Sequence, residues 1–175
     1  MAPKEDIQQI GAIAKRILGE PCWEASLSYG DELRLEIGDR IACQQKVMAG
    51  HEVGAWGFGT RGTDWQLFSS QGIILTSSAE NVQVFKEKVK IIEETTITAF
   101  ETQYPDFILT IGFSNGCELK IFPDLDDDSG VSYWELFTPD NMLLTLEPGG
   151  VWTYTRSQDG EHVTFGEKVG RDCLV

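Results

Sequence analysis

The chain of 175 residues has 41% hydrophobic content and a formal net charge of −14, which is typical of one globular domain and excludes a disordered chain poor in apolar residues. No stretch approaches the roughly 18 consecutive apolar residues of a membrane span, and charges near the N-terminus leave no apolar middle for a signal peptide. We therefore expect a single cytoplasmic domain over residues 1–175.

The first predicted element is a helix over residues 4–19. Ile10, Ile13 and Ile17 recur at three- and four-residue spacing, which places them on one face of a helix. Pro21 cannot continue the helical hydrogen bonds, so the helix ends before it.

A strand–turn–strand unit follows the helix. Leu33 and Leu35 alternate with polar residues, which is the period of a strand, and residues 29–31 supply the turn before them. From residue 41 the chain carries an inserted segment with a glycine-rich stretch around Trp56. We expect this insertion to form a loop or an edge strand, where binding residues often lie.

A second helix and a long strand are predicted in the middle of the chain. Ser77 begins a capping-box pattern ahead of Val82, Phe85 and Val89, which predicts a helix over residues 79–89. Residues 91–102 are rich in β-branched side chains, which favour a strand.

The strand–turn–strand unit occurs twice in the chain. The segments that line up are residues 27–35 with 113–121, 65–68 with 134–137, and 73–76 with 142–145. The order of the segments and the placement of turns agree between the copies, although two amphipathic hairpins can also resemble each other by chance. If the unit is duplicated, Trp65 and Trp134 should occupy equivalent, buried environments.

Two motifs resemble catalytic or nucleotide-binding signatures without the required context. Gly57, Gly59 and Gly62 match G-x-G-x-x-G, but a strand follows them where a dinucleotide site needs a helix. Ser114 lies in G-x-S-x-G, but it too is followed by a strand. The four cysteines form no C-x-x-C pair, so we expect free thiols and no metal site at them.

The acidic segment 124–135 has the spacing of a calcium loop. Asp124, Asp126 and Asp128 fall at positions 1, 3 and 5, and Glu135 falls at position 12. The glycine lies one position late and the flanking residues favour strands, so a solvated acidic loop is the preferred interpretation. Calcium binding through residues 124–135 stays an alternative.

Candidate binding residues come from charge and from aromatic side chains. Residues 93–150 hold twelve acidic residues and a single basic one, so they repel nucleic acid and anionic lipid and attract a basic partner. The candidate residues are Asp126, Asp127 and Asp128 in this acidic segment and three aromatic residues, Trp56, Trp152 and Tyr154. Simple solubility for the charge, and core packing for the aromatic rings, are the alternatives.

The order of these elements resembles small uncharacterised bacterial proteins grouped as domains of unknown function. The resemblance covers residues 22–155: a strand pair, a Trp-polar-Leu-Phe segment, a turn, an apolar strand and a helix, then a second round ending in Glu-Pro-Gly-Gly. Similar acidic proteins are often immunity proteins of bacterial toxin systems. The resemblance therefore implies a binding role, and it carries over no catalytic or binding residue.

We predict a mainly β, antiparallel fold made of two pseudo-repeats, residues 22–89 and 90–155, arranged as a sandwich or partly open barrel. The N-terminal helix, one connecting helix and a polar C-terminal segment, residues 156–175, complete it. The predicted function is non-enzymatic protein binding, as an inhibitor or immunity-type protein that presents an acidic face to a basic partner. We expect no cofactor, no metal, no nucleic acid and no membrane partner. An enzyme with a carboxylate-based site that spacing cannot reveal is the other alternative.

Overall fold

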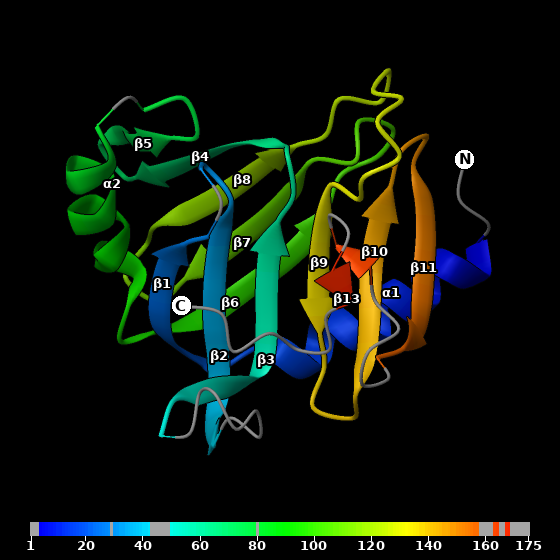
Figure 1. Cartoon of the computed structure of the whole chain (residues 1–175), viewed down its shortest axis with the longest axis horizontal. Helices are drawn as coiled ribbons and strands as arrows, with labels where there is room; N and C mark the ends of the chain where they lie inside the picture. Colours follow the sequence, from blue (N-terminus) through cyan, green and yellow to red (C-terminus); the bar gives the residue numbers. More distant parts are fainter. Residues whose placement is uncertain are drawn as a thin grey trace.

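A computed structural model of the chain describes residues 4–28, 30–42, 50–79, 81–157, 163–164 and 167–168. Within these residues, eleven antiparallel strands form one sheet, two short strands form a second, and two α-helices lie beside the large sheet (Figure 1). The helices are α1 (Lys4–Ile17) and α2 (Val82–Val89), with the short 3₁₀ helix η2 (Lys90–Ile92) after α2. The strands are β1 (Pro21–Leu27), β2 (Leu33–Ala42), β3 (Glu52–Thr60), β4 (Asp64–Ser69), β5 (Gly72–Thr76), β6 (Thr95–Thr102), β7 (Leu109–Phe113), β8 (Glu118–Phe122), β9 (Trp134–Phe137), β10 (Met142–Glu147), β11 (Val151–Arg156), β12 (Val163–Thr164) and β13 (Glu167–Lys168).

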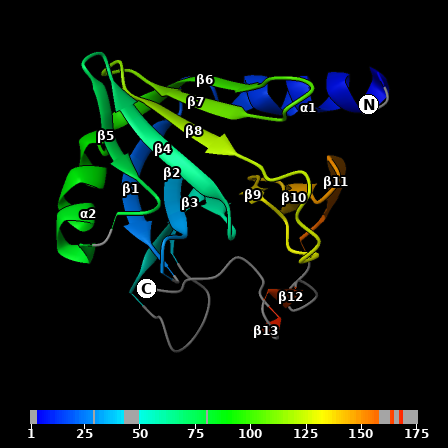
Figure 2. The ribbon, with the colours of Figure 1, turned by 90° about the horizontal axis from the view of Figure 1, so that it is seen from above.

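The large sheet bends between β1 and β6. Its strand order is β11-β10-β9-β3-β2-β1-β6-β7-β8-β4-β5, and β1 pairs with β6 through only Pro21 with Thr96 and Cys22 with Thr95. Figure 2 shows that the strands from β6 to β5 cross over the strands from β1 to β11. The predicted mainly β, antiparallel class is confirmed, and the sheet is not closed into a barrel.

One hydrophobic core fills the space between the two parts of the sheet. Apolar side chains such as Leu35 and Leu136 come from one part, and Leu109 and Leu119 come from the other, and all four are fully buried. The same core takes up Ile17 of α1 and Phe85 of α2. The alternation of apolar residues in the strands is what allows both parts to bury one face here.

The two copies of the repeated unit exchange hairpins. The β4–β5 hairpin of the first copy pairs with β8 of the second, and the β9–β10 hairpin of the second pairs with β3 of the first. The result is one continuous sheet rather than two meanders packed together. The exchanged hairpins share a register where Leu67 lies opposite Leu75 and Leu136 lies opposite Leu144, but next to the turn the first hairpin shifts its register after Leu67 and the second does not.

The other repeated hairpin differs between the copies. Leu27 pairs with Leu33 in the first copy, whereas in the second copy Leu119 pairs with Ile111, two residues away from the equivalent position. A tight turn follows Phe113 and causes this offset. It is closed by a hydrogen bond from the N–H of Phe113 to the carbonyl oxygen of Cys117.

Trp65 and Trp134 are both fully buried, but their surroundings differ. Trp65 packs edge-on against Phe85 of α2, with ring centroids 5.0 Å apart, and its indole N–H donates to the carbonyl oxygen of Asp31 at 2.8 Å. Trp134 instead packs among three aromatic rings, those of Phe58, Phe100 and Trp152. The prediction of equivalent contacts is wrong, because the helix covers only the first hairpin.

Both helices are shorter than predicted. Helix α1 ends at Ile17. Helix α2 begins at Val82, and Asn81 caps it by accepting hydrogen bonds from the N–H groups of Gln83 and Val84. The predicted cap, Ser77, instead donates to the carboxylate of Asp64.

The predicted strand at 91–102 starts only at Thr95, because Ile92 belongs to η2. None of the described helices has the length and apolar content needed to cross a membrane. Cys22 and Cys117 are free and buried, whereas Cys43 and Cys173 lie outside the described residues. Most of the predicted polar C-terminal segment also lies outside them, apart from β12 and β13, which pair with each other.

The inserted segment around Trp56 is a central strand, so the prediction of a loop or edge strand there is wrong. Strand β3 lies between β2 and β9 in the interior of the sheet. Its Gly54 passes so close to β2 that a Cβ atom would collide with the backbone nitrogen and oxygen of Ile37. A glycine is required there because the β2–β3 register shifts between Ile37 and Arg40.

Candidate binding surface

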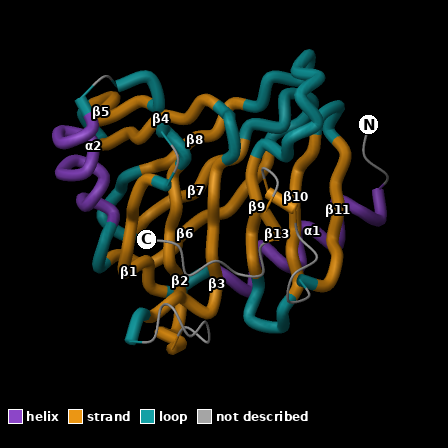
Figure 3. Tube along the Cα trace, in the orientation of Figure 1, coloured by secondary structure: helices purple, strands orange, loops and turns teal. Residues whose placement is uncertain are grey.

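Five connections meet at one end of the strands, which we call the loop end: residues 28–32, 61–64, 103–108, 123–133 and 147–150. The strand register brings them together, since Phe122 at the end of β8 lies opposite Asp64 at the start of β4. The start of β9, at Trp134, likewise lies opposite Leu146 and Thr60. Figure 3 shows these connections as loops along the upper edge of the molecule.

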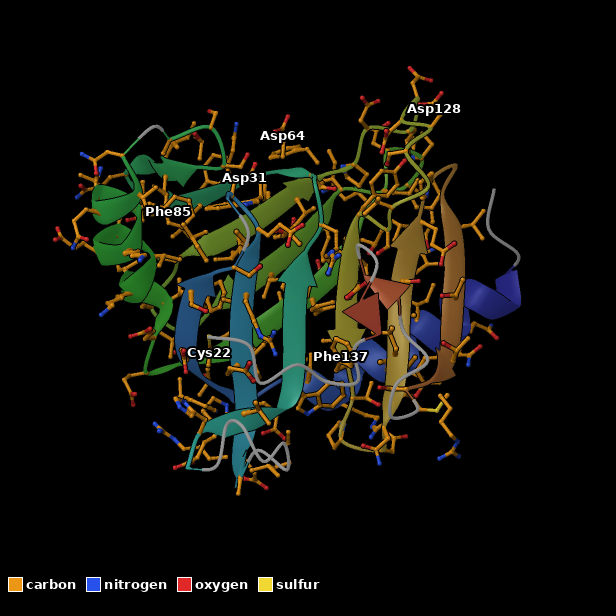
Figure 4. All side chains as sticks on the ribbon, in the orientation of Figure 1. Cys22, Asp31, Asp64, Phe85, Asp128 and Phe137 are labelled. Atoms are coloured by element: carbon orange, nitrogen blue, oxygen red, sulfur yellow. The ribbon has the colours of Figure 1, made fainter. Side chains whose placement is uncertain are left out.

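The loop end is strongly acidic. Its described residues include a single basic residue, Arg61, against nine acidic ones: Asp31, Glu32, Asp64, Asp106, Asp124, Asp126, Asp127, Asp128 and Glu147. Figure 4 labels Asp31, Asp64 and Asp128 along this edge. These residues come from distant parts of the chain, because the fold adds Asp31, Glu32 and Asp64 to six acidic residues of the segment 93–150.

Arg61 is enclosed by carboxylates of both repeats. Its guanidinium lies 3.7 Å from a carboxylate oxygen of Glu32 and 3.9 Å from one of Glu135. Burial raises the pKa of the Glu32 carboxyl, and the charge of Arg61 and the hydroxyl of Ser28 offset this only in part. The positive charge of Arg61 is therefore compensated internally.

The acidic loop between β8 and β9 is ordered by its own hydrogen bonds. The Asp127 carboxylate accepts from the Ser129 hydroxyl at 2.7 Å and from the Ser129 N–H at 3.0 Å, and these bonds lower the pKa of Asp127. The Tyr133 hydroxyl donates to the carbonyl oxygen of Asp124 at 2.7 Å. Asp126 and Asp128 are exposed and Asp127 is half-buried, so the three predicted acidic residues do lie together on the surface.

The calcium ligand set suggested by spacing is not assembled. Glu135, at the last ligand position, lies in β9, accepts a hydrogen bond from Ser132 and approaches Arg61. Within the described residues, no three His, Cys, Asp or Glu side chains form a group that could hold a metal ion. Three loop carboxylates without the bidentate twelfth residue do not make such a calcium site.

Two exposed apolar side chains, Tyr104 and Leu125, lie among the acidic residues of the loop end. Each is 38% exposed. The ring of Tyr104 packs edge-on against the ring of Phe107, with centroids 5.0 Å apart. Neither residue was predicted from the sequence, because only the register of β7 with β8 shows that the loops carrying them are neighbours.

The three aromatic residues predicted to bind a partner, Trp56, Trp152 and Tyr154, differ in their burial. Trp56 is only 2% exposed in β3, and the Arg16 guanidinium lies 5.3 Å from its ring centroid. As a core residue it offers no surface to a partner. Trp152 and Tyr154 do share one face of β11, as predicted, but this face packs against the core and both are half-buried.

A small hollow lies between β11 and α1. It has a volume of about 130 Å³ and is lined by Gln9, Ile10, Leu144, Trp152, Thr153 and Tyr154. Pockets for metabolite-sized ligands usually measure roughly 300–1,000 Å³. A cavity of roughly 150 Å³ holds a benzene molecule, so this hollow has room for one side chain.

The described carboxylates with raised pKa values do not line this hollow. Glu24 is exposed, but partial desolvation by its surroundings raises the pKa of its carboxyl, and the neighbouring carboxylates of Glu36 and Glu93 raise it further. Burial likewise raises the pKa of the Cys22 thiol to about 12, which leaves it protonated and unreactive at neutral pH. Neither group is placed for acid–base or nucleophilic chemistry in the hollow.

Comparison of the chain with protein-family models, curated proteins and solved structures gave no match. The resemblance to bacterial immunity-type proteins therefore stays a prediction.

Proposed function

We propose that this chain is a non-enzymatic binding protein, an inhibitor or immunity-type protein, whose loop end receives the basic surface of another protein. The observation that carries the proposal is the gathering of nine acidic residues at the loop end, whose described residues include one basic residue, Arg61. Because Arg61 already faces Glu32 and Glu135, it does not neutralise the exposed carboxylates of the loop end, whose negative charge can attract a basic partner.

The loop end also offers the apolar contacts that a stable interface needs. Tyr104 and Leu125 are exposed among the carboxylates. Aromatic and aliphatic anchors in the centre of an interface supply most of the binding energy, while the surrounding charges select the partner and speed its approach.

The order of the acidic loop favours binding further. Hydrogen bonds from Ser129 hold the Asp127 carboxylate, and the Tyr133 hydroxyl fixes the backbone at Asp124. A surface that is already ordered loses less conformational entropy when a partner binds.

Affinity capture from an extract of the native host at low salt tests the proposal. We expect a basic protein to be retained, and its affinity, measured on the purified pair, to fall as salt increases because salt screens the exposed charges. The triple variant Asp126→Asn, Asp127→Asn and Asp128→Asn should weaken this binding about tenfold, since each lost charge contact is worth about 0.5 kcal/mol.

A control variant separates the loop end from bulk charge. Asp39→Asn, Glu52→Gln and Glu87→Gln remove three exposed carboxylates from β2, β3 and α2, outside the loop end, and should leave the affinity unchanged. Equal losses in the two triple variants would show that net charge, not the loop end, binds the partner. Failure to retain any basic protein at low salt would reject the proposed function.

A further inference from the structure

Strand β11 is an edge of the large sheet and is regular along its whole length. All six of its residues pair with β10, from Val151 opposite Glu147 to Arg156 opposite Met142, without a bulge. Within the described residues, no strand pairs with its outer side. An unpaired edge of this kind is a template for a further strand.

The main-chain groups that point to the open side of β11 can be identified from the register. The N–H of Ser157 donates to the carbonyl oxygen of Asn141, and bonded pairs recur at every second residue in an antiparallel ladder. The N–H of Tyr133 donates to the carbonyl oxygen of Leu146, which directs Leu146 toward β9 and away from β11. The N–H and C=O groups of Trp152 and Tyr154 therefore point away from β10, toward the open edge.

Strand β11 lacks several of the features that protect natural edges. Its sequence, VWTYTR, has no proline and no lysine, its one charged residue is the last, Arg156, and Val151 is 53% exposed. By contrast, the opposite edge strand β5 has a register shift in its pairing with β4 and lies beside α2 (Figure 1). Short, bulged or covered edges resist pairing, and a regular β-branched edge favours it.

Helix α1 lies next to β11 and lines the other side of the hollow beside it. Figures 1 and 2 both show α1 passing behind β9, β10 and β11, with its N-terminal end beyond β11. The hollow of about 130 Å³ lies between them, with Gln9 and Ile10 on the helix side and Trp152 and Tyr154 on the strand side. A strand added to a sheet edge gains affinity from main-chain hydrogen bonds and specificity from pockets that take alternate side chains.

The charge at one end of the edge favours a basic residue there, whereas Arg156 ends the strand on the other side and Arg16 lies beside Tyr154. Strand β11 begins opposite Glu147, at the loop end, where the exposed carboxylates of the 123–133 loop lie. We propose that β11 binds an extended segment of the basic partner as a further strand of the sheet, with one of its apolar side chains in the hollow beside α1. The proposal rests on the proposed function, because it names how part of that partner is held.

Two synthetic octapeptides test the proposal on the unmodified protein. One alternates lysine with valine. The other alternates lysine with proline, and so carries the same charge, but its prolines lack the N–H groups of a strand. Binding is measured by titration calorimetry, and the site by amide NMR shifts and hydrogen exchange. We expect the lysine–valine peptide to slow amide exchange at Trp152 and Tyr154, and the lysine–proline peptide to bind about tenfold more weakly, because two or three main-chain hydrogen bonds are lost.

The outcomes separate this proposal from the proposed function. Equal affinity of the two peptides, with shifts confined to residues 123–133, would overturn strand addition and leave an acidic loop end that binds cations. Binding of neither peptide would also overturn strand addition, whereas the proposed function is judged on its own by capture of the basic protein and its loss in the aspartate variant.

Discussion

The two tryptophans at equivalent repeat positions should respond differently to the same substitution. Trp65→Phe removes the indole N–H that donates to the Asp31 carbonyl oxygen at 2.8 Å. Trp134→Phe removes an indole N–H that is buried without a hydrogen-bond partner. Both side chains are fully buried, so the loss of volume and apolar area is the same at both positions.

The difference between the two variants follows from the hydrogen bond. Losing a buried hydrogen bond costs about 0.5–1.5 kcal/mol, and an unsatisfied buried group costs about 1–3 kcal/mol. Trp65→Phe incurs the first cost, whereas Trp134→Phe relieves the second. We therefore expect Trp65→Phe to lower the free energy of unfolding by about 1.5–4.5 kcal/mol more than Trp134→Phe.

Urea unfolding followed by circular dichroism measures this difference. The urea dependence of the free energy should be unchanged in both variants, so that the shift in midpoint reports stability directly. The packing of Trp134 against Phe58, Phe100 and Trp152 raises the cost of Trp134→Phe and so reduces the difference between the variants. A phenyl ring keeps part of those contacts, so this effect is small. Equal costs, or a larger cost for Trp134→Phe, would refute the reasoning from the hydrogen bond.

Two other predictions concern glycine positions and pH. Gly54→Ala should destabilise the protein by more than 1 kcal/mol, roughly the minimum for overpacking, because its Cβ would collide with the backbone of Ile37. A Cβ at Gly11 in α1 meets nothing within 4 Å, so Gly11→Ala should stabilise the protein by about 0.5–1 kcal/mol. Thermal unfolding measures both variants, and a neutral Gly54→Ala would contradict the close approach of β3 to β2. Because partial desolvation raises the pKa of Glu24 above its ordinary value of 4.5, its protonated form stabilises the fold at low pH. This contribution is lost as the pH rises through the folded-state pKa. Glu24→Gln should therefore flatten the fall in stability above pH 4.5, measured by urea unfolding across pH 4–7, and an unchanged slope would exclude Glu24 as its source.

Local features of the fold could be predicted because they depend on neighbouring residues. The apolar spacing of Ile10, Ile13 and Ile17 predicted α1, and the alternation of Leu33 and Leu35 with polar residues predicted β2. The cap of α2 was misplaced because Ser77 and Asn81 are both good cap residues, and the choice was made by the hydrogen bond of Ser77 to Asp64.

The candidate surface was only partly predictable. The run Asp126, Asp127 and Asp128 is visible in the sequence, and the structure places it on an exposed loop. Tyr104 and Leu125 were missed because an exposed apolar residue gains meaning only from its neighbours in space. Trp56 was misassigned because glycines usually indicate a loop, whereas here they allow a central strand to lie close to β2.

The sequence by itself determined the β class, the two helices and the acidic character of the chain, since these follow from periodicity and composition. Only the tertiary structure decided which strands pair: an alternating pattern shows that one face of a strand is buried, but not which strand lies beside it. The exchange of hairpins between β4 and β8 and between β9 and β3, the acidic loop end and the open edge of β11 all follow from that choice of neighbours.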